Sequence, residues 1–201
     1  MPKFKRTEIV QFPKRAVDLT EGNAWARLGH PTTIQEYGAI NRIDIALEAP
    51  HLVAITSYAK VQIYNTEINE VHKTLTKFQD AAFGARFRRD GQLLAVGTSE
   101  GVVKVFDVAT KTQLRTLHGH TTATRKVDFT MDGTHVATFS DDKTVGLWDL
   151  AAETRVESFG EHGDYVRAGG VSSINSDLIV SGKYYYFYPI AMHDCKILLN
   201  V

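Results

Sequence analysis

The chain has 201 residues, of which 43% are hydrophobic and 23% are charged. This apolar content excludes wholesale disorder and suffices for one sizeable domain, or for part of a larger one. The 23 Lys and Arg residues balance the 23 Asp and Glu residues, so the chain as a whole offers no electrostatic attraction for nucleic acid or an anionic membrane. A single cysteine, Cys195, excludes an internal disulfide framework and indicates a reducing compartment.

The N-terminal segment, residues 1–34, is basic and predicted to be partly irregular. Its first fifteen residues contain a cluster of cations against the single acidic residue Glu8; these are Lys3, Lys5, Arg6, Lys14 and Arg15. The cluster is interpreted as a solvated tail, with contact to RNA phosphates as the alternative. The same charges interrupt any signal-peptide core, and no apolar run approaches the roughly 18 residues of a membrane helix. We therefore expect a cytosolic or nuclear protein without a membrane partner.

From about residue 35 the sequence repeats itself at an offset of 42 residues. Aromatic–polar pairs recur at this offset, at Tyr64-Asn65, Phe106-Asp107 and Trp148-Asp149. Apolar–charged–apolar triplets do so as well, at Ile43–Ile45, Ala85–Phe87 and Val127–Phe129. A period of about 40 to 45 residues is typical of the four-stranded blades of a β-propeller.

Short β-rich segments and turn signals fill each period. Residues 93–96 and 102–106 have the composition of strands, and the turn-forming residues 99–101 separate them. Asp90-Gly91 and Asp132-Gly133 are hairpin signals before the second strand of their repeats. No segment has a long helical periodicity, so the predicted fold class is all-β.

The repeats predict an incomplete propeller. Three complete four-stranded blades and part of a fourth are expected at residues 35–75, 76–117, 118–159 and 160–182. A ring of seven such blades needs about 294 residues. Residues 183–201 form a divergent aromatic tail, whose Pro189 stands where an inner strand is due. The tail is interpreted as foreign to the repeat and the chain as a truncated product; a divergent fourth blade that closes a small ring is the alternative.

The third repeat carries the best-preserved motif. Gly119-His120, Asp132-Gly133, residues 140–145 and Leu147-Trp148-Asp149 together resemble the WD-repeat family. By that resemblance, His120, Ser140, Asp142 and Trp148 match a hydrogen-bonding network inside the blade. A buried carboxylate, imidazole and indole all need such partners, so the residues are expected to be structural rather than catalytic. The second repeat has Phe78 and Phe106 at the His and Trp positions, so its blade is expected to rely on packing.

No catalytic, cofactor-binding or metal-binding site is predicted. His193-Asp194-Cys195 places reactive residue types next to each other, but catalytic partners usually converge from distant segments. One His, Asp and Cys without a second, spaced cluster also make a poor metal site. A propeller hydrolase remains an alternative that would require acidic residues to converge around the channel.

The predicted partner-binding residues lie in the first strand of each repeat or in the loop before it. In a propeller these loops surround the central channel, where partners often dock. The candidates are Phe83, Arg86, Arg125, Tyr165 and Arg167.

The segments that open the repeats are more specific than the repeat itself. Residues 33–40, 78–91 and 161–167 resemble the N-terminal half of a WD-repeat family of the small-subunit processome. The resemblance implies a nucleolar, non-catalytic scaffold in ribosome biogenesis and pre-18S ribosomal RNA processing. It implies other WD-repeat and helical processome proteins as partners, with pre-ribosomal RNA or U3 small nucleolar RNA reached through them, and no cofactor, membrane or small-molecule substrate. The alternatives are an adaptor in signalling or ubiquitin-ligase recruitment, and a truncated product without function.

Overall fold

The computed structural model describes residues 8–11, 32–76, 78–160, 162–174, 178–183 and 195–199. The chain divides into two compact units, residues 1–39 and 40–201. In the first unit, β1 (Glu8–Gln11) and β2 (Thr32–Gln35) pair as an antiparallel two-stranded sheet. The five cations of the basic N-terminal cluster, at positions 3, 5, 6, 14 and 15, lie outside the described residues.

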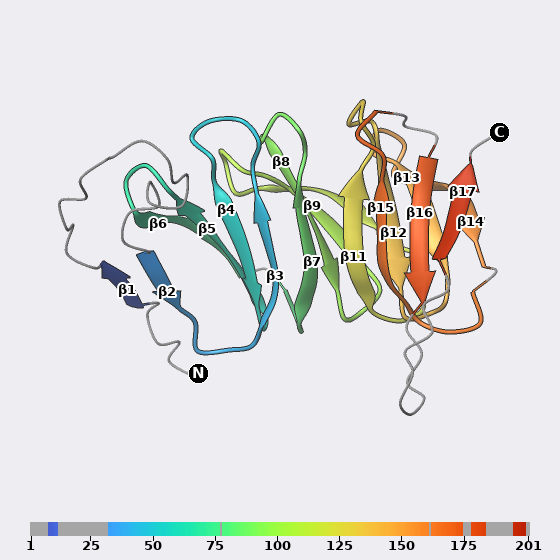
Figure 1. Cartoon of the computed structure of the whole chain (residues 1–201), viewed down its shortest axis with the longest axis horizontal. Coiled ribbons are helices and arrows are strands. Elements are labelled where there is room, and N and C mark those ends of the chain that lie inside the picture. The colour runs from blue at the N-terminus through green and yellow to red at the C-terminus, as the bar shows by residue number, and fades with distance from the viewer. Residues whose placement is uncertain are drawn as a thin grey trace, which may run out of the picture. The chain divides into compact units, whose positions relative to one another are not determined.

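The second unit consists of four antiparallel sheets that follow one another along the chain (Figure 1). We call them blades 1 to 4. Blade 1 contains β3 (Ile40–Ile45), β4 (Val53–Ser57), β5 (Lys60–Asn65) and β6 (Glu70–Leu75). Blade 2 contains β7 (Ala82–Phe87), β8 (Leu93–Thr98), β9 (Val103–Asp107) and β10 (Gln113–Leu117). Blade 3 contains β11 (Thr124–Phe129), β12 (His135–Ser140), β13 (Val145–Asp149) and β14 (Thr154–Phe159). Blade 4 contains β15 (Val166–Val171), β16 (Leu178–Lys183) and β17 (Cys195–Leu199).

The first strand of each blade is its inner strand. β7 contacts β3, β11 contacts β7, and β15 contacts β11, so the four inner strands lie in a row. Within each blade every strand pairs with the next one along the chain, which is the order of an up-and-down propeller blade. The expected all-β architecture, three complete four-stranded blades and part of a fourth in an open ring, is confirmed. None of the described residues forms a helix that is long and apolar enough to cross a membrane.

The backbone keeps the period of the sequence. Each inner strand has a β-bulge near its start, after Ile40, Ala82, Thr124 and Val166, and these positions are 42 residues apart. The turns between the third and fourth strands place Asn69, Lys111 and Glu153 in the left-handed region, again 42 residues apart. Irregularities at equivalent positions in successive blades show that the repeat extends to local geometry.

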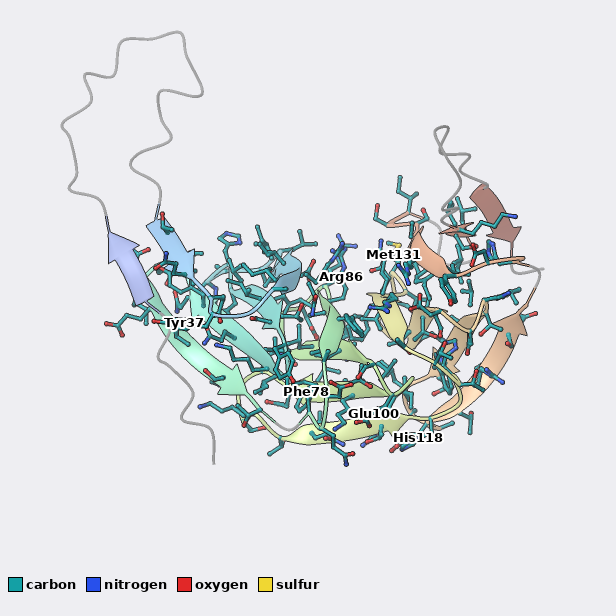
Figure 2. All side chains as sticks on the ribbon, turned by 90° about the horizontal axis from the view of Figure 1, so that it is seen from below. Tyr37, Phe78, Arg86, Glu100, His118 and Met131 are labelled. Atoms are coloured by element: carbon teal, nitrogen blue, oxygen red, sulfur yellow. The ribbon has the colours of Figure 1, made fainter. Side chains whose placement is uncertain are left out.

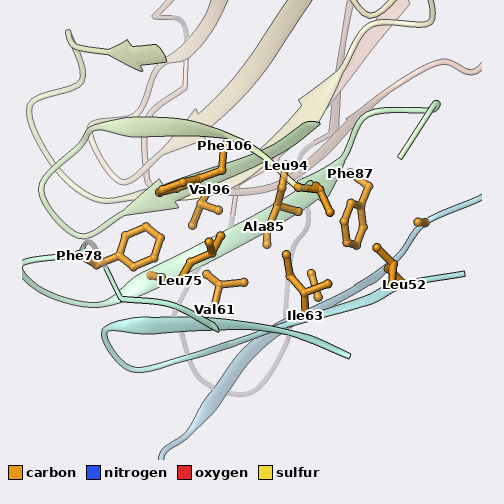
Figure 3. Packing of buried hydrophobic residues seen from close by; sticks show 14 residues of the cluster. Leu52, Val61, Ile63, Leu75, Phe78, Ala85, Phe87, Leu94, Val96 and Phe106 are labelled. Atoms are coloured by element: carbon orange, nitrogen blue, oxygen red, sulfur yellow. The ribbon is translucent and has the colours of Figure 1, made fainter. Parts of the chain in front are cut away.

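The core is divided into layers that lie between the blades. The first layer joins Val61 and Ile63 of blade 1 to Leu94, Val96 and Phe106 of blade 2 (Figure 3). The second joins the opposite face of blade 2 to blade 3 through residues such as Val103, Val127 and Trp148. The third joins Phe139 and Leu147 of blade 3 to Val166 and Ile179 of blade 4. Adjacent strand residues face opposite sides, so blades 2 and 3 each supply two apolar faces and are each stabilised by two neighbours.

The fourth blade departs from the period. The offset from β13 places its third strand at residues 187–191, but the strand that pairs with β16 is Cys195–Leu199. Residues 184–194, including Pro189 and His193-Asp194, lie outside the described part of the chain. The segment interpreted as a divergent tail therefore supplies a strand to the fourth sheet.

Candidate functional site

The bulge in each inner strand presents one residue at an equivalent position. These residues are Asn41, Phe83, Arg125 and Arg167, each 42 positions from the next. A bulge changes the direction of a side chain and is often found near functional sites. We call these four residues the bulge row. Its composition changes along the chain, from an amide through an aromatic ring to two arginines.

Asp141 joins the two arginines of the row. It lies in the turn between β12 and β13 and is 8% exposed. Arg125 donates from Nε to Oδ2 of Asp141 at 2.6 Å. Arg167 donates from Nε to Oδ1 at 2.8 Å and from Nη2 to Oδ2 at 3.3 Å. One nearly buried carboxylate thus fixes guanidinium groups from two blades, and the three side chains together carry one positive charge.

Each of these arginines also lies over an aromatic ring. The Arg125 guanidinium carbon is 3.9 Å from the ring centre of Phe83, and that of Arg167 is 5.0 Å from the ring centre of Tyr165. Both distances are within the range of cation–π attraction. The structure therefore brings together Phe83, Arg125, Tyr165 and Arg167, four of the five predicted partner-binding residues. Asp141 was not among them, although its contacts order the whole group.

Arg86, the fifth predicted residue, lies farther along its inner strand. It bonds Asp44 of blade 1 from Nη1 at 2.8 Å and Asp128 of blade 3 from Nε at 3.0 Å. Burial lowers the pKa of Arg86, but the charges of Asp128 and Asp44 outweigh it and hold the pKa above the ordinary value. The two carboxylates also accept backbone N–H groups, of Phe87 at 2.8 Å and of Val171 at 3.1 Å. Arg86 is thus part of a link between three blades.

A pocket of about 250 Å³ opens at the far ends of the inner strands. Figure 2 shows Arg86 and Met131, two of its lining residues, on the concave side of the row of blades, with His118 on the convex side. Ile45, Leu47 and Phe129 contribute apolar surface to the pocket. Three of its ionic groups, Asp44, Arg86 and Asp128, are already paired with one another, and Arg88 and Arg89 also line it.

The predicted blade network centres on Thr138, which was not among the predicted residues. Trp148 donates from Nε1 to Oγ1 of Thr138 at 2.7 Å, and Nε2 of His120 lies 2.7 Å from the same oxygen. Nδ1 of His120 lies 2.8 Å from Oδ2 of Asp142. Ser140 stands apart from this chain of contacts, because it donates to Ala123 O at 3.0 Å and accepts the Asp142 N–H at 3.1 Å.

The Asp142–His120–Thr138 arrangement has the order of a catalytic triad but not its access. Thr138 is 0% exposed, and Trp148 covers it with an exposed fraction of only 1%. Burial lowers the pKa of His120, although the carboxylate of Asp142 opposes this shift. Burial would raise the pKa of Asp142, but hydrogen bonds from Thr144 and His120 lower it. The network therefore holds a neutral imidazole beside an ionised carboxylate inside the blade.

The structure describes no centre for a metal ion. Within the described ranges, no three His, Cys, Asp or Glu side chains come together as possible ligands. The buried His162 instead lies 2.7 Å from the hydroxyl of Ser181 through Nε2, which repeats the His–hydroxyl contact of blade 3 in blade 4.

Comparison with known proteins agrees with this architecture. Residues 111–149 match the model of the WD domain, G-beta repeat. The chain is similar to the U3 small nucleolar RNA-associated protein 15 homologs of Gallus gallus, with 37% identity over 92% of the chain, and of Danio rerio, with 41% identity over 98%. The U3 small nucleolar RNA-associated protein 15 of Schizosaccharomyces pombe is 39% identical over 50% of the chain. The chain spans only 36–38% of the two vertebrate relatives.

Proposed function

We propose, on the premise that this chain is a WD-repeat propeller segment, that it is a non-catalytic scaffold in ribosome biogenesis. The observation that carries the proposal is the similarity over 92–98% of the chain to proteins whose names associate them with U3 small nucleolar RNA. That similarity extends well beyond the residues 111–149 that match the general WD repeat. It therefore favours this role over a general WD-repeat adaptor in signalling or ubiquitin-ligase recruitment.

We also propose a cellular location and partners for the chain. The chain acts in the nucleolus, in assembly of the small-subunit processome and in processing of pre-18S ribosomal RNA. Its partners are other WD-repeat and helical proteins of that assembly, and it reaches pre-ribosomal or U3 RNA through them. The absence of net charge supports indirect contact with RNA, because direct binding would need several unpaired cations.

The non-catalytic role is supported by the state of the candidate chemistry. The imidazole and hydroxyl of His120 and Thr138 are buried inside blade 3 and hydrogen-bonded. Asp44 and Asp128, the acids of the inner strands, are held by Arg86. Groups that are buried and paired in this way stabilise blades and are not free to act on a substrate.

The domain division that we propose follows the repeat. It consists of an N-terminal segment at 1–34, blades at 35–75, 76–117 and 118–159, a partial blade at 160–182, and a divergent segment at 183–201. The boundary between residues 182 and 183 is the first to test, because the Cys195–Leu199 strand pairs with β16.

Affinity purification of the tagged full chain from nuclear extract tests the proposal. We expect processome proteins and U3 RNA to be recovered, with the RNA lost after mild salt treatment that separates the proteins. A parallel chain that ends at Gly182 tests whether residues 183–201 are needed. Recovery of a different, specific set of proteins would replace the proposal with the adaptor role, and turnover of glycosides or esters by the pure chain would overturn the non-catalytic reading.

A further inference from the structure

We propose that the bulge row and its neighbours form a binding site for an acidic protein segment that presents a carboxylate next to an aromatic or aliphatic side chain. The site consists of Phe83, Arg125, Tyr165 and Arg167, at or next to the start of three successive inner strands, and of Asp141 in the turn between β12 and β13. The inference rests on the proposed scaffold role and adds to it the chemistry of a partner and the place where it binds.

Arg125 has hydrogen-bond donors that the described residues leave unused. Its only hydrogen bond within the described residues runs from Nε to Asp141, which leaves both Nη groups available. The Arg125 side chain is 30% exposed, so these groups can be reached from solvent. A guanidinium whose Nε is held and whose plane lies on a ring is preorganised, and it loses less rotamer entropy when it binds a second carboxylate.

The site combines this cation with exposed aromatic surface. Tyr165 is 46% exposed, and Phe83 is half-buried beneath Arg125. Aromatic residues and arginines are the residue types that contribute most to binding at protein interfaces. A partner residue with an apolar side chain can pack on Tyr165 while a neighbouring carboxylate binds Arg125.

The charge of the site favours an acidic protein segment over RNA. Binding to a nucleic-acid backbone depends on several cations that each neutralise a phosphate. Here Asp141 already neutralises one of the two arginines, so the cluster carries one net charge rather than a line of free cations. One available charge beside an aromatic ring fits a single carboxylate with an apolar neighbour.

The repeat offers an independent observation. Asp141 has serines at the equivalent positions of the earlier blades, Ser57 and Ser99, and the bulge row has Asn41 in blade 1. There Asn41 donates from its amide to the backbone oxygen of Ala82 at 2.9 Å, a contact between blades. The bulge position therefore serves packing in blade 1 and acquires charged and aromatic groups only in blades 2 to 4, where they assemble into one cluster.

The test measures binding of fluorescent peptides to the full chain by anisotropy. The probes are the labelled peptide Gly-Glu-Phe-Asp-Gly, its uncharged analogue Gly-Gln-Phe-Asn-Gly, and a labelled ten-nucleotide oligouridylate. We expect the acidic peptide to bind at least tenfold more tightly than the uncharged analogue and more tightly than the oligonucleotide. Equal affinity for the two peptides, or preference for the oligonucleotide, would overturn the proposal.

Variants locate the site. Arg125→Ala should reduce the preference for the acidic peptide to about twofold or less, and Arg125→Lys, which keeps the charge but not the planar fork, should retain only part of it. Tyr165→Ala should weaken binding of both peptides. Arg115→Ala is the matched control, because Arg115 is a half-exposed arginine on the outer strand β10, far along the blade from the bulge row; it should leave the preference unchanged.

The preference is a ratio of two affinities measured on the same sample, so partial unfolding of a variant does not change it. A preference that survives Arg125→Ala would overturn the assignment to this site. The tagged Arg125→Ala chain also separates this inference from the scaffold role. If it still recovers processome proteins while the wild-type chain shows no acidic preference, the inference fails and the scaffold role stands.

Discussion

Blades 2 and 3 each bury a pair of rings at equivalent positions, but only the pair in blade 3 has polar partners. In blade 3, the rings of His120 and Trp148 lie 5.9 Å apart at an interplanar angle of 62°. In blade 2, the rings of Phe78 and Phe106, at the equivalent positions, lie 5.6 Å apart at 59°. The polar hydroxyl of Thr138 in blade 3 corresponds to Val96 in blade 2, and both residues are 0% exposed.

The comparison separates the effect of packing on the ring geometry from the effect of the hydrogen bonds. The distance and tilt of the two rings are nearly the same with and without polar partners, so the geometry follows from packing between blades. The hydrogen bonds of His120, Thr138 and Trp148 then satisfy polar groups that the sequence has placed in that space. The polar set of blade 3 and the apolar set of blade 2 each leave no group without a matching neighbour. A blade that mixes the two sets should be less stable than a blade with either one.

The largest effect is expected from truncating the large ring of each blade. Trp148→Ala and Phe106→Ala each remove a side chain that is at most 1% exposed, so each should lower the free energy of unfolding by about 3–5 kcal/mol. Trp148→Ala should cost more, because it also deprives the buried Thr138 of a donor. Urea denaturation followed by circular dichroism measures both, and a smaller loss for Trp148→Ala would mean that the hydrogen bonds add nothing to packing.

The second-largest effect is expected from placing an apolar residue of blade 2 among the polar residues of blade 3. Thr138→Val gives blade 3 the residue of blade 2 and leaves Nε1 of Trp148 and Nε2 of His120 without their partner. We expect a loss of about 2–3 kcal/mol, since unsatisfied buried polar groups cost roughly 1–3 kcal/mol each. The triple variant His120→Phe, Thr138→Val, Trp148→Phe restores the consistent set of blade 2.

The triple variant should therefore be more stable than Thr138→Val alone, within about 1.5 kcal/mol of the wild type. Urea denaturation of the wild type, the single variant and the triple variant in one buffer gives the comparison. If the three substitutions simply add, the polar residues of blade 3 do not act as a unit.

The sequence predicted the repeat well because the period constrains buried residues. The 42-residue offset identified the aromatic–polar pairs, and these end the third strand of each of blades 1 to 3. The same offset predicted that Phe78 and Phe106 take the places of His120 and Trp148 in blade 2 and pack without hydrogen bonds. Thr138 was missed because threonine is common in strands, and only the structure shows that its hydroxyl points between two rings.

The candidate site was predicted only in part. Phe83, Arg125 and Arg167 share one position of the repeat, so the sequence could indicate that they lie at equivalent places. Asp141 could not be chosen in the same way, because it has serines at the equivalent positions of the earlier blades. Arg86 was grouped with the others for its charge, but its two bonds to Asp44 and Asp128 depend on the distances between blades, which the sequence does not contain.

A smaller effect distinguishes the two blades by pH. Burial lowers the pKa of His120 in the folded chain, so the unfolded chain takes up this proton first as the pH falls. The free energy of unfolding should therefore be highest above the ordinary histidine pKa of about 6.5, and fall as the pH drops through that value towards the folded pKa. The slope for one proton is at most about 1.4 kcal/mol per pH unit.

Comparison of the wild type with the triple variant between pH 7.5 and 5 isolates this contribution, because the variant lacks His120 and keeps the other histidines. Asp142, whose pKa is also lowered, has a linkage of the same sign in a lower pH range: its contribution is present above the ordinary Asp pKa of about 3.9 and is lost only below it. Parallel pH profiles for the two proteins would show that His120 does not titrate differently in the folded and unfolded chains.

The smallest effect concerns cations that link the outer strands to the next blade. Lys73 of blade 1 donates from Nζ to the backbone oxygens of Val108 and Ala109 in blade 2. Arg115, 42 residues later, donates from Nε to Leu150 O of blade 3 at 3.2 Å and lies 3.3 Å from Glu153. The equivalent residue of blade 3 is Glu157, which has no side-chain proton to donate when ionised.

Because these cations lie near the surface, Lys73→Met and Arg115→Met should each cost about 0.5–1 kcal/mol and retain most of the apolar contact of the side chain. The loss should persist in high salt for Lys73, which donates to neutral carbonyl oxygens, and shrink for Arg115, which also pairs with Glu153. Urea denaturation at low and high sodium chloride measures the difference. An equal salt dependence for the two variants would mean that the ion pair with Glu153 contributes nothing, and that the carbonyl contacts alone connect each blade to the next.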